Sequence, residues 1–318
     1  MMANSALQLP IIDLSCSDRI STAQSIRQAC MEYGFFYLIN HGVEEELLKR
    51  VFEESRKFFV LPSEERMKVV RKDHRGYTPL YAEKLDPSSI SKGDSKESFY
   101  IGPLEDMKNQ WPPAELLPLW RSTMEEYHKS VLNAGKRLIS LVALALNLDE
   151  DFFTKVGALD PPNGFLRLLH YPAELGVADQ QIYGASAHSD YGMITLLAAE
   201  DVGGLQISRE KFEQNQVWED VHHVNGAFIV NIADMMERWT NCLFRSTLHR
   251  VLPTGGERYS AAFFLDGNPD CMVECLKSCC SILQSASETI YSNALGLLMV
   301  DVVRSKTANG KVCGRNLL

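Results

Sequence analysis

The spacing of apolar residues divides the chain into a helix-rich first half and a strand-rich second half. Apolar positions at helical spacing predict helices over residues 20–33, 44–60 and 119–148. Two short apolar runs, residues 9–14 and 34–39, predict strands, and the second is closed by an Asn-His-Gly turn. The first half is therefore expected to be mixed, with helices that can cover one face of a sheet.

After Pro161 the apolar runs become short and closely spaced, with Gly, Pro, Asn and Asp between them. They predict strands over residues 165–171, 193–198, 204–207, 217–221, 227–232, 247–251 and 259–265. Many short strands at this spacing are typical of a β-sandwich or jelly roll. The stretch 74–113, rich in Gly, Pro, Ser and charge, predicts long loops with an extended segment at residues 98–101.

Composition and charge exclude several classes of protein. The chain is 45% hydrophobic and 23% charged, as in ordinary globular proteins, and its net charge of −9 argues against a nucleic-acid partner. Neither a secretory signal nor an apolar run long enough to span a bilayer is recognised. Eight cysteines in a long chain of this kind are typical of reduced thiols. We expect a cytoplasmic monomer without membrane contact.

Two histidines and an aspartate are candidate metal ligands. His188 and Asp190 are two residues apart in an extended segment, so their side chains project to the same side. His249 lies inside a later predicted strand. Two imidazoles and a carboxylate can occupy one face of a metal ion and leave about three positions open, as in non-haem iron oxygenases. His222 and His223 are alternative third ligands, although their polar turn suits exposure better.

The ligand types alone do not identify the metal, because iron, manganese, nickel and zinc all accept imidazole and carboxylate. A structural zinc site would have four ligands, often thiolates. Four cysteines near the end of the chain lack the C-x-x-C spacing of such sites, so we interpret them as packing or surface residues: Cys271, Cys275, Cys279 and Cys280.

Arg258 and Ser260 share one side of the last predicted strand. Arginine binds a carboxylate through two parallel hydrogen bonds and stays charged at any working pH. The pair could therefore hold an acidic co-substrate. The alternative is an intramolecular salt bridge, for example with Glu257 or Asp266.

Together these pieces resemble the 2-oxoglutarate- and iron(II)-dependent dioxygenases of plants and fungi. Within that class the chain is similar to the branch of the fungal nicotinate-catabolism oxygenases and their plant relatives. The resemblance covers roughly residues 9–280 and depends on the order and spacing of eight segments: PIIDL, GFFYLINHG, RGY, DSKESFYIG, LRLLHYP, AHSDYGMITLL, STLHRV and ERYSAAFF.

The resemblance implies a mainly β fold with flanking helices, built on a double-stranded β-helix (jelly-roll) core. It implies an α/β region over residues 1–160, a catalytic domain over residues 161–280 and a tail over residues 281–318 that does not look like the family's usual ending. It also implies iron(II) and 2-oxoglutarate, held respectively by His188, Asp190 and His249 and by Arg258, Ser260 and Tyr171.

The implied reaction oxidises a small organic metabolite with dioxygen, most often by hydroxylation, while 2-oxoglutarate is converted to succinate and carbon dioxide. Ascorbate is the expected reductant. Demethylation and desaturation belong to the same class of chemistry. Two alternatives stay open, namely a catalytically impaired binding protein of the same fold and an iron oxidase that does not use 2-oxoglutarate.

Two departures from the family pattern affect the site. Many relatives have Asn-x-Tyr where this chain has Leu169-His170-Tyr171, so an amide is absent. The family often has Asn-Gly before the second histidine, whereas this chain has Asn241-Cys242. Cysteine tolerates a positive φ less well than glycine, so we expect a strained turn.

Four aromatic residues are candidates to line the substrate pocket, with the hydrophobic core as the alternative for each: Tyr77, Phe99, Phe263 and Phe264. Four charged residues that precede or begin the extended segment at residues 98–101 are interpreted as a solvated face: Lys84, Lys92, Lys96 and Glu97.

Overall fold

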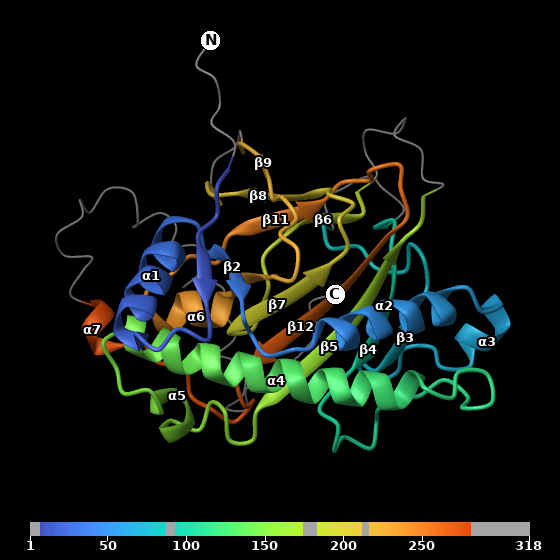
Figure 1. Ribbon diagram of the computed structural model, residues 1–318, viewed down its shortest axis with the longest axis horizontal. Helices are drawn as coiled ribbons and strands as arrows, with labels where there is room; N and C mark the ends of the chain where they lie inside the picture. The colour runs from blue at the N-terminus through green and yellow to red at the C-terminus, as the bar shows by residue number, and fades with distance from the viewer. Residues whose placement is uncertain (1–6, 87–92, 174–182, 212–215, 281–318) are drawn as a thin grey trace, which may run out of the picture.

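Two β-sheets face each other in the computed structural model, which describes residues 7–86, 93–173, 183–211 and 216–280 (Figure 1). We call the eight-stranded sheet the major sheet and the four-stranded one the minor sheet. In spatial order the major sheet contains β1 (Ile11–Asp13), β2 (Phe35–Ile39), β10 (Phe228–Ile232), β7 (Ile194–Ala199), β12 (Arg258–Asp266), β5 (Asn163–Tyr171), β4 (Glu97–Ile101) and β3 (Gly76–Thr78). The minor sheet contains β6 (Ala185–His188), β11 (Leu248–Val251), β8 (Leu205–Ser208) and β9 (Glu219–Asp220).

The longer helices cover the face of the major sheet that points away from the minor sheet. In Figure 1 the long green helix α4 runs along this face, with α1 and α2 near its two ends. The helices are α1 (Arg19–Glu32), α2 (Glu45–Phe59), α3 (Ser63–Met67), α4 (Trp120–Ala145), α5 (Phe152–Lys155), α6 (Asp234–Trp239) and α7 (Lys277–Cys280). No helix among the residues that the structure describes is long and apolar enough to cross a membrane.

Local sequence explains where the first two helices begin and end. The Asp18 side chain accepts a hydrogen bond from the backbone N–H of Ser21 at 3.0 Å and so caps α1. Helix α2 has two glutamates in its first turn and Arg56 and Lys57 in its last, which complements the helix dipole at both ends. Its apolar face, which includes Val51, packs into the core.

Side chains of the major sheet alternate between two cores, because successive residues of a strand point to opposite faces. On β5, Leu166 and Leu168 belong to the large core between the sheet and the helices. Leu169 and Tyr171 belong to a smaller core between the two sheets. Strand β12 pairs antiparallel with β5, with Arg258 opposite Tyr171. The functional side chains described below come from the face that points toward the minor sheet.

The elements predicted from the apolar pattern are confirmed to within a few residues at their ends. Strands β3 and β6 were not predicted; β3 falls in the stretch interpreted as loop. The region before residue 160 also contributes four strands to the major sheet, β1 and β2 at one edge and β3 and β4 at the other. The predicted tail, residues 281–318, lies outside the described residues.

Candidate metal centre and co-substrate site

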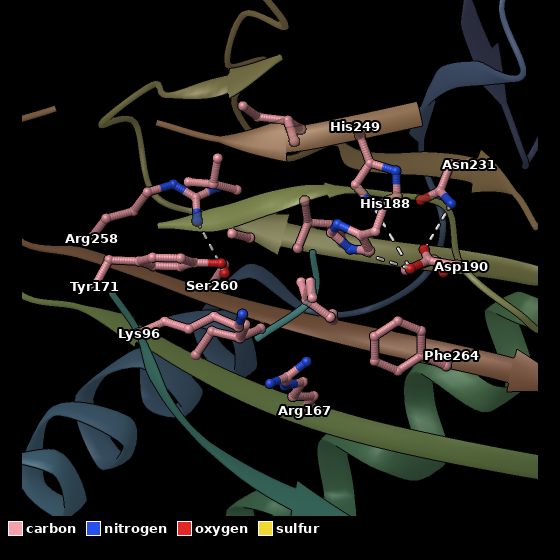
Figure 2. A pocket seen from close by; sticks show the side chains of 18 of the residues that line it. Lys96, Arg167, Tyr171, His188, Asp190, Asn231, His249, Arg258, Ser260 and Phe264 are labelled. Atoms are coloured by element: carbon pink, nitrogen blue, oxygen red, sulfur yellow. Dashed lines mark hydrogen bonds and ion pairs between the residues drawn. The ribbon is translucent and has the colours of Figure 1, made fainter. Parts of the chain in front are cut away.

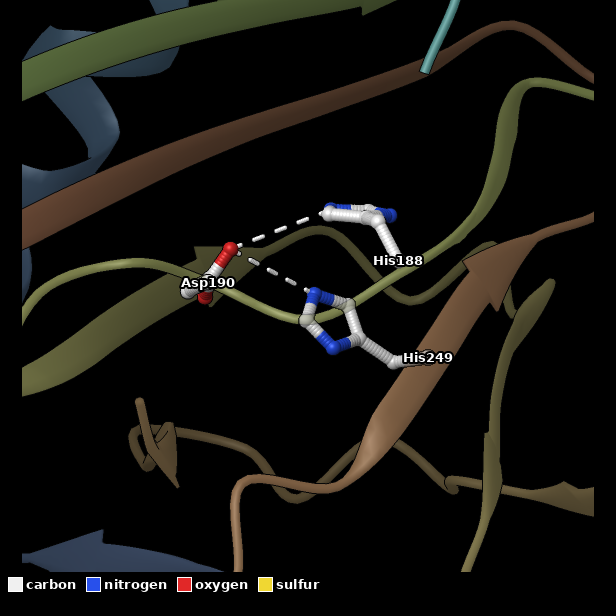
Figure 3. Close-up of side chains that lie close together, drawn as sticks. All are labelled: His188, Asp190 and His249. Atoms are coloured by element: carbon white, nitrogen blue, oxygen red, sulfur yellow. Dashed lines mark ion pairs between the residues drawn. The ribbon is translucent and has the colours of Figure 1, made fainter. Parts of the chain in front are cut away.

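His188, Asp190 and His249 converge at one end of a cavity between the two sheets. Figure 2 shows them among the cavity-lining side chains, and Figure 3 shows the three alone. His188 ends β6 and pairs with His249 on the neighbouring strand β11, while Asp190 lies two residues beyond His188. The Nε2 atoms of His188 and His249 lie 3.8 Å and 3.7 Å from Asp190 Oδ1.

Both imidazole rings are oriented by backbone carbonyls. His188 Nδ1 lies 2.7 Å from the carbonyl oxygen of Ser186, and His249 Nδ1 lies 3.2 Å from that of Thr247. A ring that donates its Nδ1–H to a carbonyl carries a lone pair on Nε2, which is the atom that can bind a metal. The two rings therefore direct lone pairs toward the carboxylate of Asp190.

The carboxylate of Asp190 is held through its other oxygen. Asp190 Oδ2 accepts hydrogen bonds from Thr195 Oγ1 at 2.6 Å and from Asn231 Nδ2 at 2.8 Å, which leaves Oδ1 facing the histidines. Burial acts to raise the pKa of Asp190, but the nearby His249 and His188 and these two hydrogen bonds outweigh it and hold the pKa below its usual range. Asp190 is therefore an anionic ligand at neutral pH.

The residues present fit a divalent metal ion. A separation of 3.7 to 3.8 Å is too long for a hydrogen bond, yet an ion bound at about 2.0–2.2 Å from each atom can bridge it. Burial, together with the neighbouring His249, lowers the pKa of His188 to about 4, so its ring is neutral and able to bind metal at pH 7. This is the one such cluster found among the described histidine, cysteine and acidic residues.

The alternative third ligands are not part of this cluster. His222 is exposed, and its backbone carbonyl accepts a hydrogen bond from the Tyr37 hydroxyl at 2.6 Å. His223 is partly buried in the same turn. The structure therefore brings His249, as predicted, to His188 and Asp190.

Arg258 lies at the other end of the same cavity. The residue is 3% exposed. Its guanidinium donates from Nε to the Gly203 carbonyl at 3.1 Å and from Nη1 to Ser260 Oγ at 3.2 Å, and lies 5.0 Å from the centre of the Tyr171 ring (Figure 2). No carboxylate of a described residue lies within salt-bridge distance of Arg258. The alternative partner Glu257 instead contacts His170 Nε2 at 2.8 Å.

Apolar side chains make up most of the remaining cavity wall. They include Leu169, which stands where many relatives have an amide, and Phe264, which follows Arg258 and Ser260 on the same side of β12. The others are Phe35, Leu85, Ala185, Leu197, Leu205, Val251 and Ala262.

The structure corrects three of the four predicted pocket aromatics. Phe264 lines the cavity. Tyr77, Phe99 and Phe263 are at most 3% exposed and belong to the large core on the helical side of the major sheet. Phe263 differs from Phe264 by one position in the strand, which turns its side chain to the opposite face.

Sequence reasoning missed four polar residues of the cavity. Thr195 and Asn231 hold Asp190, and Lys96 and Arg167 line the wall. The interpretation of Lys96 and Glu97 as solvated is wrong, since they are 2% and 5% exposed. Of these four residues only Arg167 could have been predicted. It lies four positions before Tyr171 on the same predicted strand, so both side chains point to the same face of the sheet.

The comparisons with known proteins agree with this geometry. Residues 162–267 match the 2OG-Fe(II) oxygenase superfamily, and residues 9–120 match the family described as the N-terminal region of non-haem dioxygenase in morphine synthesis. The chain is 41% identical to azadirone synthase LFS of Melia azedarach, with 86% of each chain covered. It is 34% identical to the 2-oxoglutarate-Fe(II) type oxidoreductase hxnY of Emericella nidulans, with 85% of this chain and 83% of the relative covered.

A solved structure of a full-length Neurospora crassa protein in complex with alpha-KG and thymine superposes with a TM-score of 0.77 at 29% identity, covering 90% of this chain and 92% of that one. The chain belongs to the 2OG-Fe(II) oxygenase family. The predicted family, the double-stranded β-helix fold and the assignment as a 2-oxoglutarate-dependent dioxygenase are thereby confirmed. Iron(II) and 2-oxoglutarate are the cofactor and co-substrate of this family.

Proposed function

We propose that the protein hydroxylates a small organic metabolite, with release of succinate and carbon dioxide from 2-oxoglutarate. The observation that carries the proposal is a buried cation, Arg258, at the far end of the cavity that contains the metal cluster. Among the described residues no carboxylate lies within salt-bridge distance of it. The proposed ligands are His188, Asp190 and His249 for iron(II), and Arg258, Ser260 and Tyr171 for the distal carboxylate of 2-oxoglutarate.

Arg258 is suited to bind a carboxylate because no carboxylate of a described residue pairs with it. A buried charge is costly unless it is paired, and the described residues give Arg258 neutral hydrogen-bond acceptors, such as the Gly203 carbonyl and the Ser260 hydroxyl. Lys96 and Arg167, the other cations of the cavity wall, both contact carboxylates. A dicarboxylic acid that reaches from Arg258 toward the metal cluster would supply the missing negative charge.

Each part of the cavity has a defined task in this reaction. When bound, iron(II) supplies the redox chemistry that couples the oxidative decarboxylation of 2-oxoglutarate to oxidation of the substrate. Thr195 and Asn231 fix the carboxylate of Asp190, so that the ligand geometry is set before metal binds. Apolar walls such as Leu169 and Phe264 exclude water and hold one C–H bond of the substrate close to the metal.

Replacement of the co-substrate anchor tests the proposal. We expect Arg258→Gln to raise the KM for 2-oxoglutarate by about 100-fold, because a charge-assisted bidentate contact is lost. Succinate formation with iron(II) and ascorbate is the measurement. Arg209→Gln is the matched control, since Arg209 forms a partly exposed pair with Glu219 and does not line the cavity.

Two other results would favour the alternatives. An unchanged KM in Arg258→Gln would show that Arg258 does not hold 2-oxoglutarate. Substrate oxidation without 2-oxoglutarate and without succinate formation would point to an iron oxidase. Succinate formation no greater than in His188→Ala would point to a binding protein without catalytic activity. Ascorbate as reductant, a monomeric state and a cytoplasmic location are further parts of the proposal, and size-exclusion chromatography with light scattering tests the second of these.

A further inference from the structure

Two buried cations lie in the cavity wall apart from Arg258. Lys96, immediately before β4, is 2% exposed, and Arg167 on β5 is 6% exposed. Figure 2 shows both on the β4–β5 side of the cavity, across from His188 and His249. Neither residue has a role in the assignments made above, so the chemistry that they offer to a ligand is open.

Both cations are already neutralised by carboxylates. Lys96 Nζ lies 2.6 Å from Asp94 Oδ2 and 3.1 Å from Glu83 Oε2. Arg167 forms an ion pair with Glu83 and donates to Ser98 Oγ at 3.1 Å. Burial acts to raise the pKa of Glu83, but Arg167 and Lys96 outweigh it and lower the pKa to about 2. The two cations of the cavity wall therefore face two carboxylates within hydrogen-bond distance. Arg71, a third cation 3.6 Å from Glu83, does not line the cavity.

Lys96 and Arg167 retain unused N–H groups although both are paired with carboxylates. The Lys96 ammonium has three N–H bonds, and carboxylates of Asp94 and Glu83 accept two of them. A guanidinium has five N–H bonds, and Glu83 and Ser98 accept from one nitrogen of Arg167. This part of the wall can therefore donate hydrogen bonds to a ligand, although both of its cations are already paired with carboxylates.

The carboxylates already present beside Lys96 and Arg167 favour one kind of ligand. A carboxylate placed against Lys96 would also lie close to the carboxylates of Asp94 and Glu83, in a site where low exposure strengthens repulsion. A neutral oxygen acceptor avoids that repulsion and costs much less to desolvate. The neighbouring wall residues Leu85 and Leu169 suit an apolar skeleton.

We propose that Lys96 and Arg167 form a substrate-recognition wall of the cavity, on its β4–β5 side, and take an apolar substrate through a neutral oxygen acceptor, such as a ketone, lactone or amide carbonyl. A substrate carboxylate is disfavoured there. This inference deepens the proposed function, because it depends on 2-oxoglutarate occupying the Arg258 end of the same cavity.

The test compares two probes of one skeleton. Cyclohexanone and cyclohexanecarboxylate are titrated into the iron(II) enzyme saturated with 2-oxoglutarate under nitrogen, and dissociation constants are obtained by ligand-observed NMR. We expect cyclohexanone to bind about tenfold more tightly than the carboxylate. Arg167→Gln and Lys96→Met should each weaken cyclohexanone binding by about tenfold, the loss expected for a hydrogen bond to a charged donor.

Matched variants separate recognition from folding. Arg71 lies 3.6 Å from Glu83 but does not line the cavity. Arg71→Gln should therefore change the dissociation constant for cyclohexanone less than about threefold. Arg167→Lys retains a cationic donor and should restore part of the affinity. The dissociation constant for 2-oxoglutarate, measured on the same samples, should stay close to that of the unmodified protein, which shows that the site is folded.

Three outcomes would overturn the inference: tighter binding of the carboxylate, no binding of either probe, or unchanged cyclohexanone affinity in both the Arg167→Gln and Lys96→Met variants. Failure of the proposed function gives a different result, since 2-oxoglutarate itself would then not bind the unmodified iron(II) protein.

Discussion

At the scale of single residues, strand parity decides which side chains reach the cavity. Arg258, Ser260, Ala262 and Phe264 alternate along β12 and all line it. The sequence predicts that Arg258 and Ser260 share a side, and the same alternation places Phe264, but not Phe263, on that side. Counted from Ser260 in steps of two, the alternation reaches Phe264, which lines the cavity, and passes over Phe263, which lies in the core.

The two aromatic environments give a paired prediction. Phe99 is fully buried against Trp120, with ring centres 4.8 Å apart, so Phe99→Ala should lower the free energy of unfolding by about 3–5 kcal/mol. Phe264→Ala should cost less stability and should mainly reduce substrate-dependent succinate formation. Urea denaturation and turnover assays on both variants check this, and a turnover defect in a stably folded Phe99→Ala protein would contradict the core assignment.

Asp266 gives a prediction about pH. Burial, with a smaller effect of Asp190, raises the pKa of Asp266 to about 6, so the folded protein binds more protons here than the unfolded chain between about pH 4 and 6. The favourable contribution of its protonated form is therefore lost as pH rises through 6. In metal-free protein, Asp266→Asn should be more stable than the unmodified chain by about 2 kcal/mol at pH 8.

The difference should disappear near pH 4, and denaturant titrations across this range are the measurement. Asp270→Asn, on the exposed loop after β12, is the control and should leave the pH profile unchanged. Equal stability of Asp266→Asn and the unmodified chain at pH 8 would refute the burial argument.

At the scale of elements, the local sequence pattern predicts helices well, because a helix forms its backbone hydrogen bonds within one segment of the chain. Helices α1, α2 and α4 have apolar residues at helical spacing, and the sequence predicted each to within a few residues. Strands β3 and β6 are short and carry few apolar residues, and β6 is held largely by pairing with β11, more than fifty residues later. Such a strand depends on a distant partner, which a local pattern cannot show.

The turn after α6 has the strained backbone that the sequence predicts for Asn241 and Cys242, and this strain leads to a prediction about stability. Asn241 and Cys242 have φ angles of 51° and 62°, in the left-handed region that glycine adopts without strain. We expect Cys242→Gly to raise the free energy of unfolding by about 1 kcal/mol, because the penalty on Cβ is removed. Cys16→Gly, at an exposed position without positive φ, is the control and should not stabilise the protein. Thermal denaturation of both variants gives the answer.

At the scale of the whole molecule, the metal ligands could be predicted from the sequence, whereas the ion pairs of the cavity wall could not. His188, Asp190 and His249 could be grouped by type and strand context. The pairing of Lys96 with Asp94 and Glu83 depends on loops whose paths follow from the packing of the entire domain, so the sequence made Lys96 look solvated. The boundaries at residues 160 and 280 stay a prediction.

Because the site lies between the two sheets, ligands should stabilise the whole fold. Iron(II) with 2-oxoglutarate at 100 times their dissociation constants should add about 2.7 kcal/mol for each ligand that binds the folded state alone, and so raise Tm by several degrees. Differential scanning calorimetry under nitrogen measures the shift, and a chelator should reverse it. The shift should be lost in His249→Ala; if it persisted there, the ligands would bind elsewhere.

The edge of the major sheet has a consequence for biosynthesis. Strand β2 lies between β1 and β10, and the pairing of Leu38 with Phe228 joins positions about 190 residues apart. At about 5–20 residues per second, the ribosome needs roughly 10–40 seconds after making β2 to make its partner. During that interval the apolar segment Phe35–Ile39 has one open edge. We therefore expect this strand to be prone to pairing with other chains until translation reaches β10.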